Sequence, residues 1–571
     1  MSVLFLSAGG KNPDIIGAFQ RIVKREPRHL IVVCGTIGSP LGREATKYQY
    51  VDLFQFSPPP GRDGFLATNA LLTFALLLSR AYASLNETGS PPPRSLKALV
   101  HPGRSANEYA TTLRRACQPL WDRDNLLLLY GNTTQAAAVD LESKFSEAAL
   151  GTVQLTDYRN FAHGRHNWLA KRGGSTAVLA LVSEEDRDVA ERTLRLLPKS
   201  TPLVRIWIPL PEELAGISAL VAVLHIAGLA GSARGIDPGR PGVPPFGRKI
   251  YNLRVWKTSS NAWAPFPSRK VAAIERKTGV AISGLEGEEL SYWARAYEEF
   301  IRKIQSPRFG AVVFDYDGTL CDRRDRFIGI RHQGRTWLNQ LLSAGIAIGI
   351  ATGRGKSVKE TLREAVDRRF WPSLLVGYYN GGDIGILSDD SHPDASNTAP
   401  PELKAIAEAL NRNPLLRGLA DVDLRFAQLT VTPKLISHWD QVWKMVQHTL
   451  HSLALVGVRV LRSSHSVDVL ALGVSKLRLF GEVEKLATQG RGGPVLCIGD
   501  LGCWPGNDFD LLSTQYSLSV DEVSPDPTTC WNLAPPGHRG VQACLDYLRA
   551  MKIQGSSVKL KVSDIHLGNS K

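Results

Sequence analysis

The chain has 571 residues, more than one hydrophobic core usually supports, so its length predicts roughly three or four domains. A hydrophobic content of 43% and a charged content of 21% are typical of globular proteins and exclude a disordered or fibrous chain. The net charge of +14 is compatible with nucleic-acid binding, but the basic residues are dispersed and no aromatic-basic motif accompanies them, so attraction of phosphorylated metabolites explains the charge equally well.

The sequence also bears on location. We find no apolar run long enough to cross a membrane, and the first residues, MSVLFLSAGGKNPD, lack the basic segment and small-residue cleavage site of a signal peptide. The seven cysteines form no CxxC pair, and their odd number does not suit a disulfide framework. We therefore expect a cytoplasmic protein with reduced cysteines and no membrane partner.

Residues 1–90 contain two strand–loop–helix patterns, VLFLSAGGKNPDIIGAFQRIV and LIVVCGTIGSPLGREA. A small-residue loop at a helix N-terminus presents free amides to an anion. The first loop carries Ser7 and Asn12 and resembles the phosphate loop of sugar isomerase (SIS) domains, although Asn12 stands where that family prefers a hydroxyl. The resemblance implies an incomplete first SIS half that starts at the family's second strand. An ordinary α/β turn is the alternative.

A more complete copy is predicted at residues 94–250, after the proline-rich stretch GSPPPR. DNLLLLYGNTTQAAAVDLESKFSEAAL predicts a buried strand, a loop and a helix, and TVQLTDYRNFAHGRH supplies a His-Gly pair. The stretch resembles the second SIS half of glucosamine-6-phosphate synthase-type enzymes. That resemblance implies a phosphosugar site made of Asn132, Thr133, Thr134, Lys144, Glu147 and His163. Pairing of Lys144 with Glu147 along the helix would explain those two residues without a ligand.

The N-terminal module is expected to bind a ligand rather than to isomerise it, because no glutaminase-like domain and no first glycine-rich loop precede it. It could also join two chains into a homodimer. Residues 251–306 follow as a predicted linker and connector helix, in which ELSYWARAYEEFIRKI places aromatic residues at helical spacing.

The central motif of the chain is FGAVVFDYDGTL, residues 309–320, a buried strand that ends in two aspartates, a glycine and a threonine. Asp315 and Asp317 leave the strand on the same side, so both carboxylates can face one pocket. The motif resembles the first motif of the haloacid dehalogenase (HAD) phosphatases, DxDGT. The resemblance implies that Asp315 is the nucleophile on phosphorus and that Asp317 is the general acid and base.

Two later motifs continue the resemblance on the phosphate-binding side. IAIGIATGR is an apolar strand ending in Thr352, Gly353 and Arg354, which would hold phosphoryl oxygens. LALGVSKLRL supplies Lys476, whose ammonium would offset the charge that develops on the phosphoryl group.

The last motif concerns the metal. VLCIGD ends in Asp500, and Asp508 follows after LGCWPGN, a longer separation than the family pattern has, so Asp510 is the alternative ligand. The resemblance implies that Asp315, Asp317, Asp500 and Asp508 hold Mg²⁺, which prefers hard oxygen ligands.

These motifs place a Rossmann-like HAD core at residues 307–388 and 468–552, with an inserted α/β cap at residues 389–467. The insertion resembles the cap of the Cof-type branch, which includes many sugar phosphatases, and Asn380-Gly381-Gly382 fits that branch. Residues 553–571 are polar and are expected to be a flexible tail. The fold class is therefore α/β, with SIS-type parallel-sheet modules before the HAD core.

The sequence as a whole predicts a Mg²⁺-dependent phosphatase that acts on a sugar phosphate or a related small metabolite through an aspartyl-phosphate, fused to a phosphosugar-binding SIS module. One alternative is an aldose/ketose sugar-phosphate isomerase with a fused phosphatase. Another is a phosphosugar-sensing regulator with little turnover.

Overall fold

The structure is a computed structural model. It describes residues 1–57, 63–85, 93, 95, 98–99, 104–253, 266–326, 328–393, 398–453, 457–463, 465–489 and 492–566. The predicted boundary at residues 90–94, the first part of the connector and the last five residues of the predicted tail lie largely outside these ranges.

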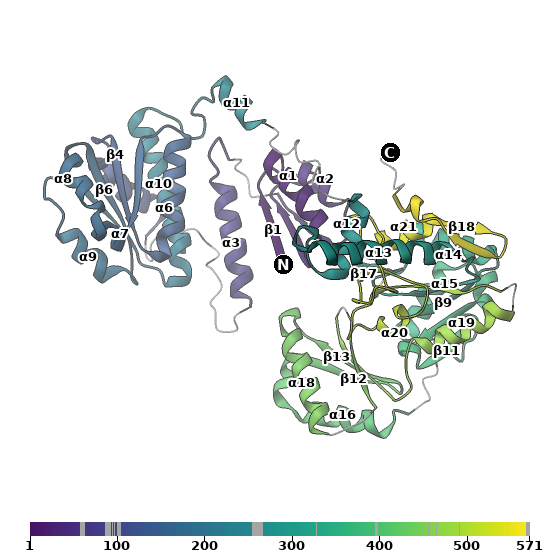
Figure 1. The fold of residues 1–571 in the computed structure, drawn as a ribbon. Helices are drawn as coiled ribbons and strands as arrows, with labels where there is room; N and C mark the ends of the chain where they lie inside the picture. The colour runs from purple at the N-terminus through teal and green to yellow at the C-terminus, as the bar shows by residue number, and fades with distance from the viewer. Residues whose placement is uncertain are drawn as a thin grey trace.

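The N-terminal segment forms a small three-stranded parallel sheet in the order β1-β2-β3 (Figure 1). Its elements are β1 (Ser2–Ser7), α1 (Pro13–Ile22), β2 (His29–Cys34), α2 (Pro40–Ala45) and β3 (Val51–Gln55). Alternate strand residues such as Phe5 and Leu30 pack against Phe19 of α1 and Leu41 of α2. One face of the sheet is thereby covered, as the period of two in each strand requires.

A second parallel sheet has the order β5-β4-β6-β7. Its strands are β4 (Asn125–Tyr130), β5 (Thr152–Asp157), β6 (Thr176–Ser183) and β7 (Leu203–Ile208). Its main helices are α5 (Ala106–Cys117), α6 (Gln135–Glu147), α8 (Asn167–Arg172), α9 (Arg187–Arg195) and α10 (Glu212–Arg234), and α3 (Asn69–Ala83) lies beside them. Every residue of β6 is buried, as expected for a central parallel strand covered on both faces.

Helix α10 corrects the expectation that no apolar run could cross a membrane. By length and composition alone it is long and apolar enough to do so, and 67% of the relevant window is buried inside the protein. It packs along α6, so the core of the second sheet accounts for its apolar sequence.

The C-terminal part is built on a six-stranded sheet in the order β11-β10-β9-β8-β16-β17, parallel except for β11. Its strands are β8 (Ala311–Asp315), β9 (Ala347–Ala351), β10 (Leu374–Tyr378), β11 (Asp383–Ile386), β16 (Val495–Leu501) and β17 (Ser517–Glu522). Its helices are α14 (His332–Ser343), α15 (Lys356–Ala365), α19 (Leu477–Gln489), α20 (Phe509–Leu512) and α21 (Val541–Ala550). The chain is thus mixed α/β with parallel sheets, which confirms the predicted class.

An inserted unit interrupts this sheet between β11 and α19 (Figure 1). It is an antiparallel sheet in the order β12-β13-β15-β14, with helices on one side. Its elements are α16 (Pro401–Arg412), α17 (Pro414–Leu419), β12 (Ala420–Leu424), β13 (Gln428–Pro433), α18 (Trp439–Ser452), β14 (Arg459–Arg462) and β15 (Val467–Leu470). Because β15 pairs with β13 and β14, residues 468–470 belong to this unit and not to the core segment predicted to begin at 468.

The connector region contains three helices, α11 (Pro245–Tyr251), α12 (Ser268–Thr278) and α13 (Gly287–Gln305). α13 packs on the C-terminal sheet, where Phe300 stacks on Trp531 with 5.9 Å between ring centroids. The predicted flexible tail is wrong for residues 553–566. β18 (Met551–Gln554) and β19 (Ser557–Leu560) form a hairpin there, and Val558 is fully buried and pairs with Phe309.

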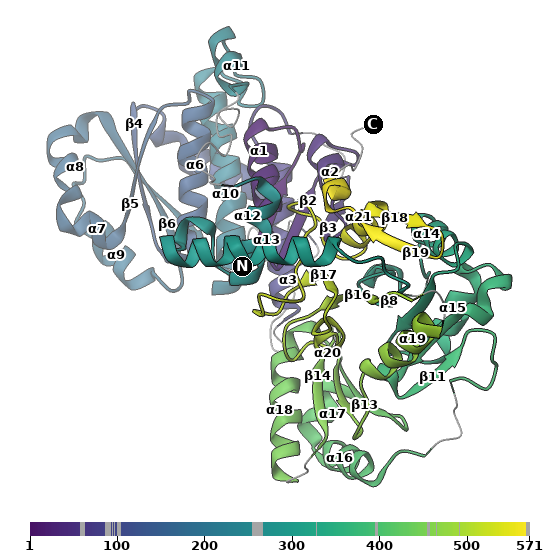
Figure 2. The same cartoon turned by 45° about the vertical axis from the view of Figure 1, so that its right-hand side comes forward.

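The N-terminal sheet lies between the second sheet and the C-terminal part, and two views show it against the C-terminal part (Figures 1 and 2). A buried ion pair joins them, because Arg276 Nε of α12 donates to Glu26 Oε2 at 2.9 Å. The amide of Gly537 donates to the other carboxylate oxygen of Glu26 at 2.6 Å. Residues far apart in the sequence are therefore held in one body at this junction.

Candidate functional site

The site lies at the carboxyl edge of the C-terminal sheet, where β8, β9 and β16 end side by side. β8 is buried along its whole length and delivers Asp315, whose register partner on β9 is Ala351. Thr352 therefore follows at the same edge, and Asp500 is the penultimate residue of the neighbouring strand β16. Parallel pairing brings these predicted motifs together, because the carboxyl ends of parallel strands share one edge.

Three aspartates form a buried cluster at this edge. Asp315, Asp500 and Asp508 each offer a carboxylate oxygen, and these atoms lie within 4.8 Å of one another. Lys476 Nζ, which is also buried, donates to Asp315 Oδ1 at 2.7 Å and to Asp508 Oδ1 at 2.6 Å. Arg323 also donates to Asp500, but two positive groups do not balance three carboxylates, so the cluster retains negative charge for a cation.

The donor set fits a hard divalent cation such as Mg²⁺. Asp315 Oδ2 is buried and has no hydrogen-bond partner among the described residues, which is costly unless a ligand completes the site. The three residues that would hold the ion are those of the cluster, all through oxygen atoms.

The pKa values of the three aspartates reflect their burial and their closeness to one another. Burial, followed by the nearby charge of Asp508, raises the pKa of Asp315 to about 8 against the opposing effect of Lys476. Burial also raises the pKa of Asp500 well above its usual range. Burial acts on Asp508 in the same direction, but Lys476 and the hydrogen bonds it receives hold its pKa below the usual value. The carboxylates therefore cannot all ionise easily together.

The structure places Asp508, rather than Asp510, in the cluster. Asp508 Oδ2 accepts the backbone N–H groups of Asp500 at 2.9 Å and Leu501 at 3.2 Å, so the intervening loop folds back on its own strand. Asp510 instead accepts from Arg459 Nη2 at 2.9 Å and from Ser475 Oγ at 2.7 Å. The long separation in the sequence is thus taken up by the loop.

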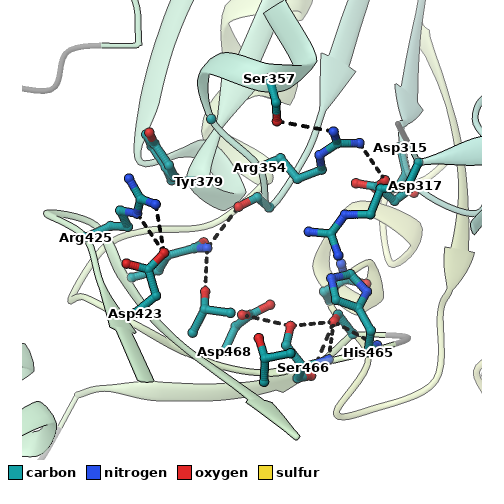
Figure 3. Close-up of a pocket in the computed structure, with 18 of the residues that line it drawn as sticks. Asp315, Asp317, Arg354, Ser357, Tyr379, Asp423, Arg425, His465, Ser466 and Asp468 are labelled. Atoms are coloured by element: carbon teal, nitrogen blue, oxygen red, sulfur yellow. Dashed lines mark hydrogen bonds and ion pairs between the residues drawn. The ribbon is translucent and has the colours of Figure 1, made fainter. Parts of the chain in front are cut away.

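Asp317 stands apart from the three clustered carboxylates. It is only partly buried, and its Oδ1 accepts from Arg354 Nη1 at 3.2 Å (Figure 3). The structure does not bring its carboxylate into the group that could hold a metal, although that role was predicted. Its position beside Asp315 on the rim suits exchange of a proton with a bound molecule.

The predicted phosphate-binding turn is held rigidly. Thr352 is fully buried, and its Oγ1 accepts the backbone N–H of Arg354 at 3.0 Å. The backbone N–H of Asn380 donates to the carbonyl of Thr352 at 2.8 Å, so the asparagine-glycine turn after β10 is hydrogen-bonded to the Thr352 turn. Gly353 and Arg354 then face the cavity described next.

A polar cavity of about 420 Å³ opens above the aspartates, between the core and the inserted unit (Figure 3). Its far wall comes from the inserted strands and carries Asp423, Arg425, Gln428, Thr430, Thr432, His465, Ser466 and Asp468. Burial lowers the pKa of His465 to about 4 and raises that of Asp468 to about 6, so the histidine is neutral near pH 7. Hydroxyl, amide and carboxylate groups thus face the catalytic edge across one space.

Gln428 ties the inserted unit to the catalytic turn. Its Nε2 donates to the carbonyl of Gly353 at 2.9 Å, and its Oε1 accepts from Asn380 Nδ2 at 2.9 Å. No sequence motif marks Gln428, and the same is true of Arg323, whose Nη2 donates to Asp500 Oδ2 at 3.1 Å. Sequence reasoning missed both residues, because only tertiary contacts bring them to the site.

The first N-terminal loop uses its predicted ligand groups internally. Ser7 Oγ accepts the N–H of Gly10 at 3.0 Å, and Asn12 Oδ1 caps α1 by accepting the N–H of Asp14 at 2.7 Å. These bonds are those of an ordinary α/β turn, which was the alternative interpretation.

The second N-terminal loop also departs from the prediction. Thr134 is fully buried and its hydroxyl exchanges hydrogen bonds with the backbone of Gly131, so it is not available to a phosphate. Lys144 is buried and pairs with Asp140, not with Glu147. Thr133 Oγ1 donates to Ser183 Oγ at 3.1 Å.

Three other predicted residues of this module, Asn132, Glu147 and His163, are exposed. A cavity of about 630 Å³ on the second sheet is lined by different residues, among them Gln154 and Trp168. The structure therefore does not gather the predicted phosphosugar residues around this cavity.

The comparisons with known proteins agree with the C-terminal geometry. The family model of haloacid dehalogenase-like hydrolases matches residues 312–420. The match supports a hydrolase of the haloacid dehalogenase superfamily at these residues. No curated protein is significantly similar to the chain in sequence.

Solved structures that resemble part of the chain include the HAD subclass IIB sugar phosphatase BT4131, with 18% identity, 38% of this chain and 93% of that chain covered, and a TM-score of 0.28. Trehalose-6-phosphate phosphatase of Aspergillus fumigatus has 18% identity, 44% and 96% coverage and a TM-score of 0.29. The C-terminal domain of the C. albicans trehalose-6-phosphate phosphatase has 16% identity, 36% and 74% coverage and a TM-score of 0.27. Such low values leave the chemistry of this chain to be argued from its own residues.

Proposed function

We propose that the C-terminal part is a Mg²⁺-dependent phosphatase that hydrolyses a sugar phosphate or a related small phosphorylated metabolite. The observation that carries the proposal is the buried Asp315, which meets Lys476 through one oxygen while its other oxygen has no partner among the described residues. Such an oxygen, held at a strand end, is placed to attack phosphorus.

The chain's own residues can perform both half-reactions. An Asp315 oxygen forms a bond to phosphorus as the bond to the leaving oxygen breaks, and Asp317 gives its proton to that oxygen. In the second half, Asp317 takes a proton from water, whose oxygen displaces Asp315 and releases inorganic phosphate. Arg354 holds Asp317 on the rim, and Lys476 stabilises the charge on the phosphoryl oxygens.

Mg²⁺, held by Asp315, Asp500 and Asp508, would neutralise charge on the phosphoryl group and allow the carboxylates to stay ionised. Burial of all three residues excludes water from competing contacts.

The inserted unit supports a polyhydroxylated leaving group. It acts as a cap, because Gln428 connects it to Gly353 and its polar residues face Asp315 and Asp317 across the cavity. Neutral hydroxyl groups on this wall, such as that of Thr432, can hydrogen-bond sugar hydroxyls. This chemistry favours a phosphorylated sugar over an apolar phosphate ester.

Phosphate release from a panel of phosphorylated sugars and other small metabolites tests the proposal. Wild type with Mg²⁺ should hydrolyse at least one sugar phosphate, and Asp315→Asn should hydrolyse none. Asp390→Asn, the same change at an exposed aspartate, is the control and should match wild type. Hydrolysis by Asp315→Asn at the wild-type rate would refute the mechanism.

The N-terminal phosphosugar-binding role, the homodimer and the cytoplasmic location stay predictions. Exposure of Asn132 and His163 near the carboxyl edge of the second sheet favours a ligand there, whereas the internal bonds of Thr134 and Lys144 do not. Titration of full-length Asp315→Asn with hexose phosphates, comparing His163→Ala with the parent variant, would test binding by this module.

A further inference from the structure

A second cavity, of about 300 Å³, lies at the junction between the N-terminal sheet and the catalytic core. The N-terminal sheet contributes Arg28 and Gln49, and the core contributes Arg323, Arg324 and Arg539. Apart from Gly318 of the first motif, the lining residues lie outside the motifs, and the proposed reaction does not use this space.

The cavity is suited to an anion. Four arginines and three aspartates line it, and Arg323 also donates to Asp500 outside the lining. Two of the aspartates already have arginine partners, because Asp322 accepts from Arg324 Nε at 3.1 Å and Asp521 accepts from Arg539 Nε at 2.7 Å. Arg28 has no ion-pair partner among the described residues. Guanidinium groups are well suited to phosphate.

The cavity also favours a ligand that can donate a hydrogen bond. Gln49 Oε1 is buried and has no hydrogen-bond donor among the residues that the structure describes. A ligand that carries an acidic or alcoholic O–H beside its anionic oxygens would satisfy this atom. Inorganic phosphate and phosphate monoesters of polyols both have that chemistry.

The cavity shares a wall with the catalytic site. Gly318, in the turn after Asp317, lines it with a φ of +86°, and a Cβ added at Gly318 would lie 2.1 Å from Asp500 Oδ2. Arg323 also lines the cavity, and its Nη2 donates to Asp500 Oδ2 at 3.1 Å. The same guanidinium can therefore respond to a ligand on one side and to the carboxylate cluster on the other.

We propose that this cavity binds a phosphate group and that the bound group regulates the catalytic cluster through Arg323. The anion draws Arg323 away from Asp500, and Asp500 then has its full charge available to the cation. Phosphate binding at the junction thus strengthens cation binding at the catalytic site. The regulatory part rests on the proposed function, whereas phosphate binding itself does not.

Thermal unfolding of the full chain in EDTA tests the binding step without any turnover. Under chelation the catalytic aspartates repel anions, so stabilisation by inorganic phosphate reports on the junction. Wild type should gain stability with a saturable dependence on phosphate at constant ionic strength. Arg28→Glu should need at least about tenfold more phosphate to reach the same increase in thermal stability.

Lys24→Glu is the matched control, because it makes the same charge change at an exposed residue of the same unit, outside the cavity. It should behave as wild type. Equal gains in all three proteins would show a general salt effect and overturn the proposal, as would the absence of a saturable gain in wild type. A hexose 6-phosphate that acts at lower concentration than inorganic phosphate would identify an organic phosphate as the ligand, and equal potency would identify inorganic phosphate.

Calorimetric titration with Mg²⁺ tests the coupling. In wild type, phosphate should lower the Kd for Mg²⁺, partly through the catalytic site and partly through the junction. Arg28→Glu should lose the second part and Lys24→Glu should keep both. The same lowering in all three proteins would overturn regulation through Arg323 while leaving the phosphatase proposal intact.

Discussion

Replacing Asp315 with asparagine should abolish turnover and, in the absence of metal, make the folded protein more stable. The amide has nearly the shape of the carboxylate and keeps an acceptor for Lys476, which lies 2.7 Å from Asp315 Oδ1. It cannot form an acyl-phosphate, and it removes one of three carboxylates whose oxygens lie within 4.8 Å. Activity and stability should therefore change in opposite directions.

The size of the stability gain follows from the pKa of Asp315. Burial and Asp508 raise that pKa from 3.8 to about 8, so the folded protein retains a proton that the unfolded chain releases. The free energy of unfolding therefore falls as pH rises from about 4 to about 8 and is level above that range. The free energy of unfolding at pH 7 is then lower than its value below pH 4 by on the order of 4 kcal/mol. Asparagine removes this dependence.

Urea unfolding in EDTA between about pH 5 and pH 8 measures the effect directly. The wild-type midpoint should fall with pH, and the Asp315→Asn midpoint should fall less and be higher at pH 7. Asp390→Asn, exposed and outside the cluster, should follow wild type. Adding Mg²⁺ should raise the wild-type midpoint more than that of Asp315→Asn. A variant that is as sensitive to pH as wild type, and no more stable, would refute this account of the cluster.

Three other changes have expected outcomes. EDTA should remove phosphate release and Mg²⁺ should restore it, and full turnover after thorough chelation would contradict the metal site. Gln428→Leu should lower kcat/KM about 5- to 150-fold, because the amide of Asn380 and the carbonyl of Gly353 lose their hydrogen-bond partner. An unchanged kcat/KM would show that the inserted unit does not contribute to the reaction through Gln428. Lys277→Met should lower the free energy of unfolding in urea by roughly 3 kcal/mol, since Nζ donates to three backbone carbonyls at 2.6–2.7 Å. The control Lys303→Met loses one bond to the same loop and should lower it by under about 1 kcal/mol. Equal losses in the two variants would contradict this account.

The sequence predicted the catalytic edge well because its information is local. Three of the four motifs are a buried apolar strand with polar residues at its end, and the structure confirms strands at 311–315, 347–351 and 495–501. Parallel strands share an edge, so the order of motifs along the chain predicts their meeting in space. The structure was needed to place Asp508, because a longer loop can fold back without a signal in the periodicity, and to find Gln428 and Arg323.

The same reasoning fails where one local pattern serves two purposes. Asn12 and Thr134 lie in loops between a strand and a helix, where a polar side chain either caps the helix or binds an anion. The local sequence pattern does not distinguish a capping residue from an anion-binding one. In the structure these side chains bond to their own loops, so helix capping and turn formation account for them.

The sequence also could not show which segments form one body. It predicted residues 1–90 as an incomplete SIS half and residues 251–306 as a linker and connector helix. In the structure Glu26 and Arg276 form an ion pair, and their side chains are 14% and 8% exposed. Arg276 also donates to the carbonyls of Asn532 and Ala534, beside the C-terminal sheet. Breaking a buried pair by removing one partner costs about 3–5 kcal/mol, so deletion of the first sheet would leave Arg276 uncompensated inside the catalytic part. The N-terminal sheet and the C-terminal part therefore form one packed body, and a ligand at their junction would act on Asp500 through Arg323.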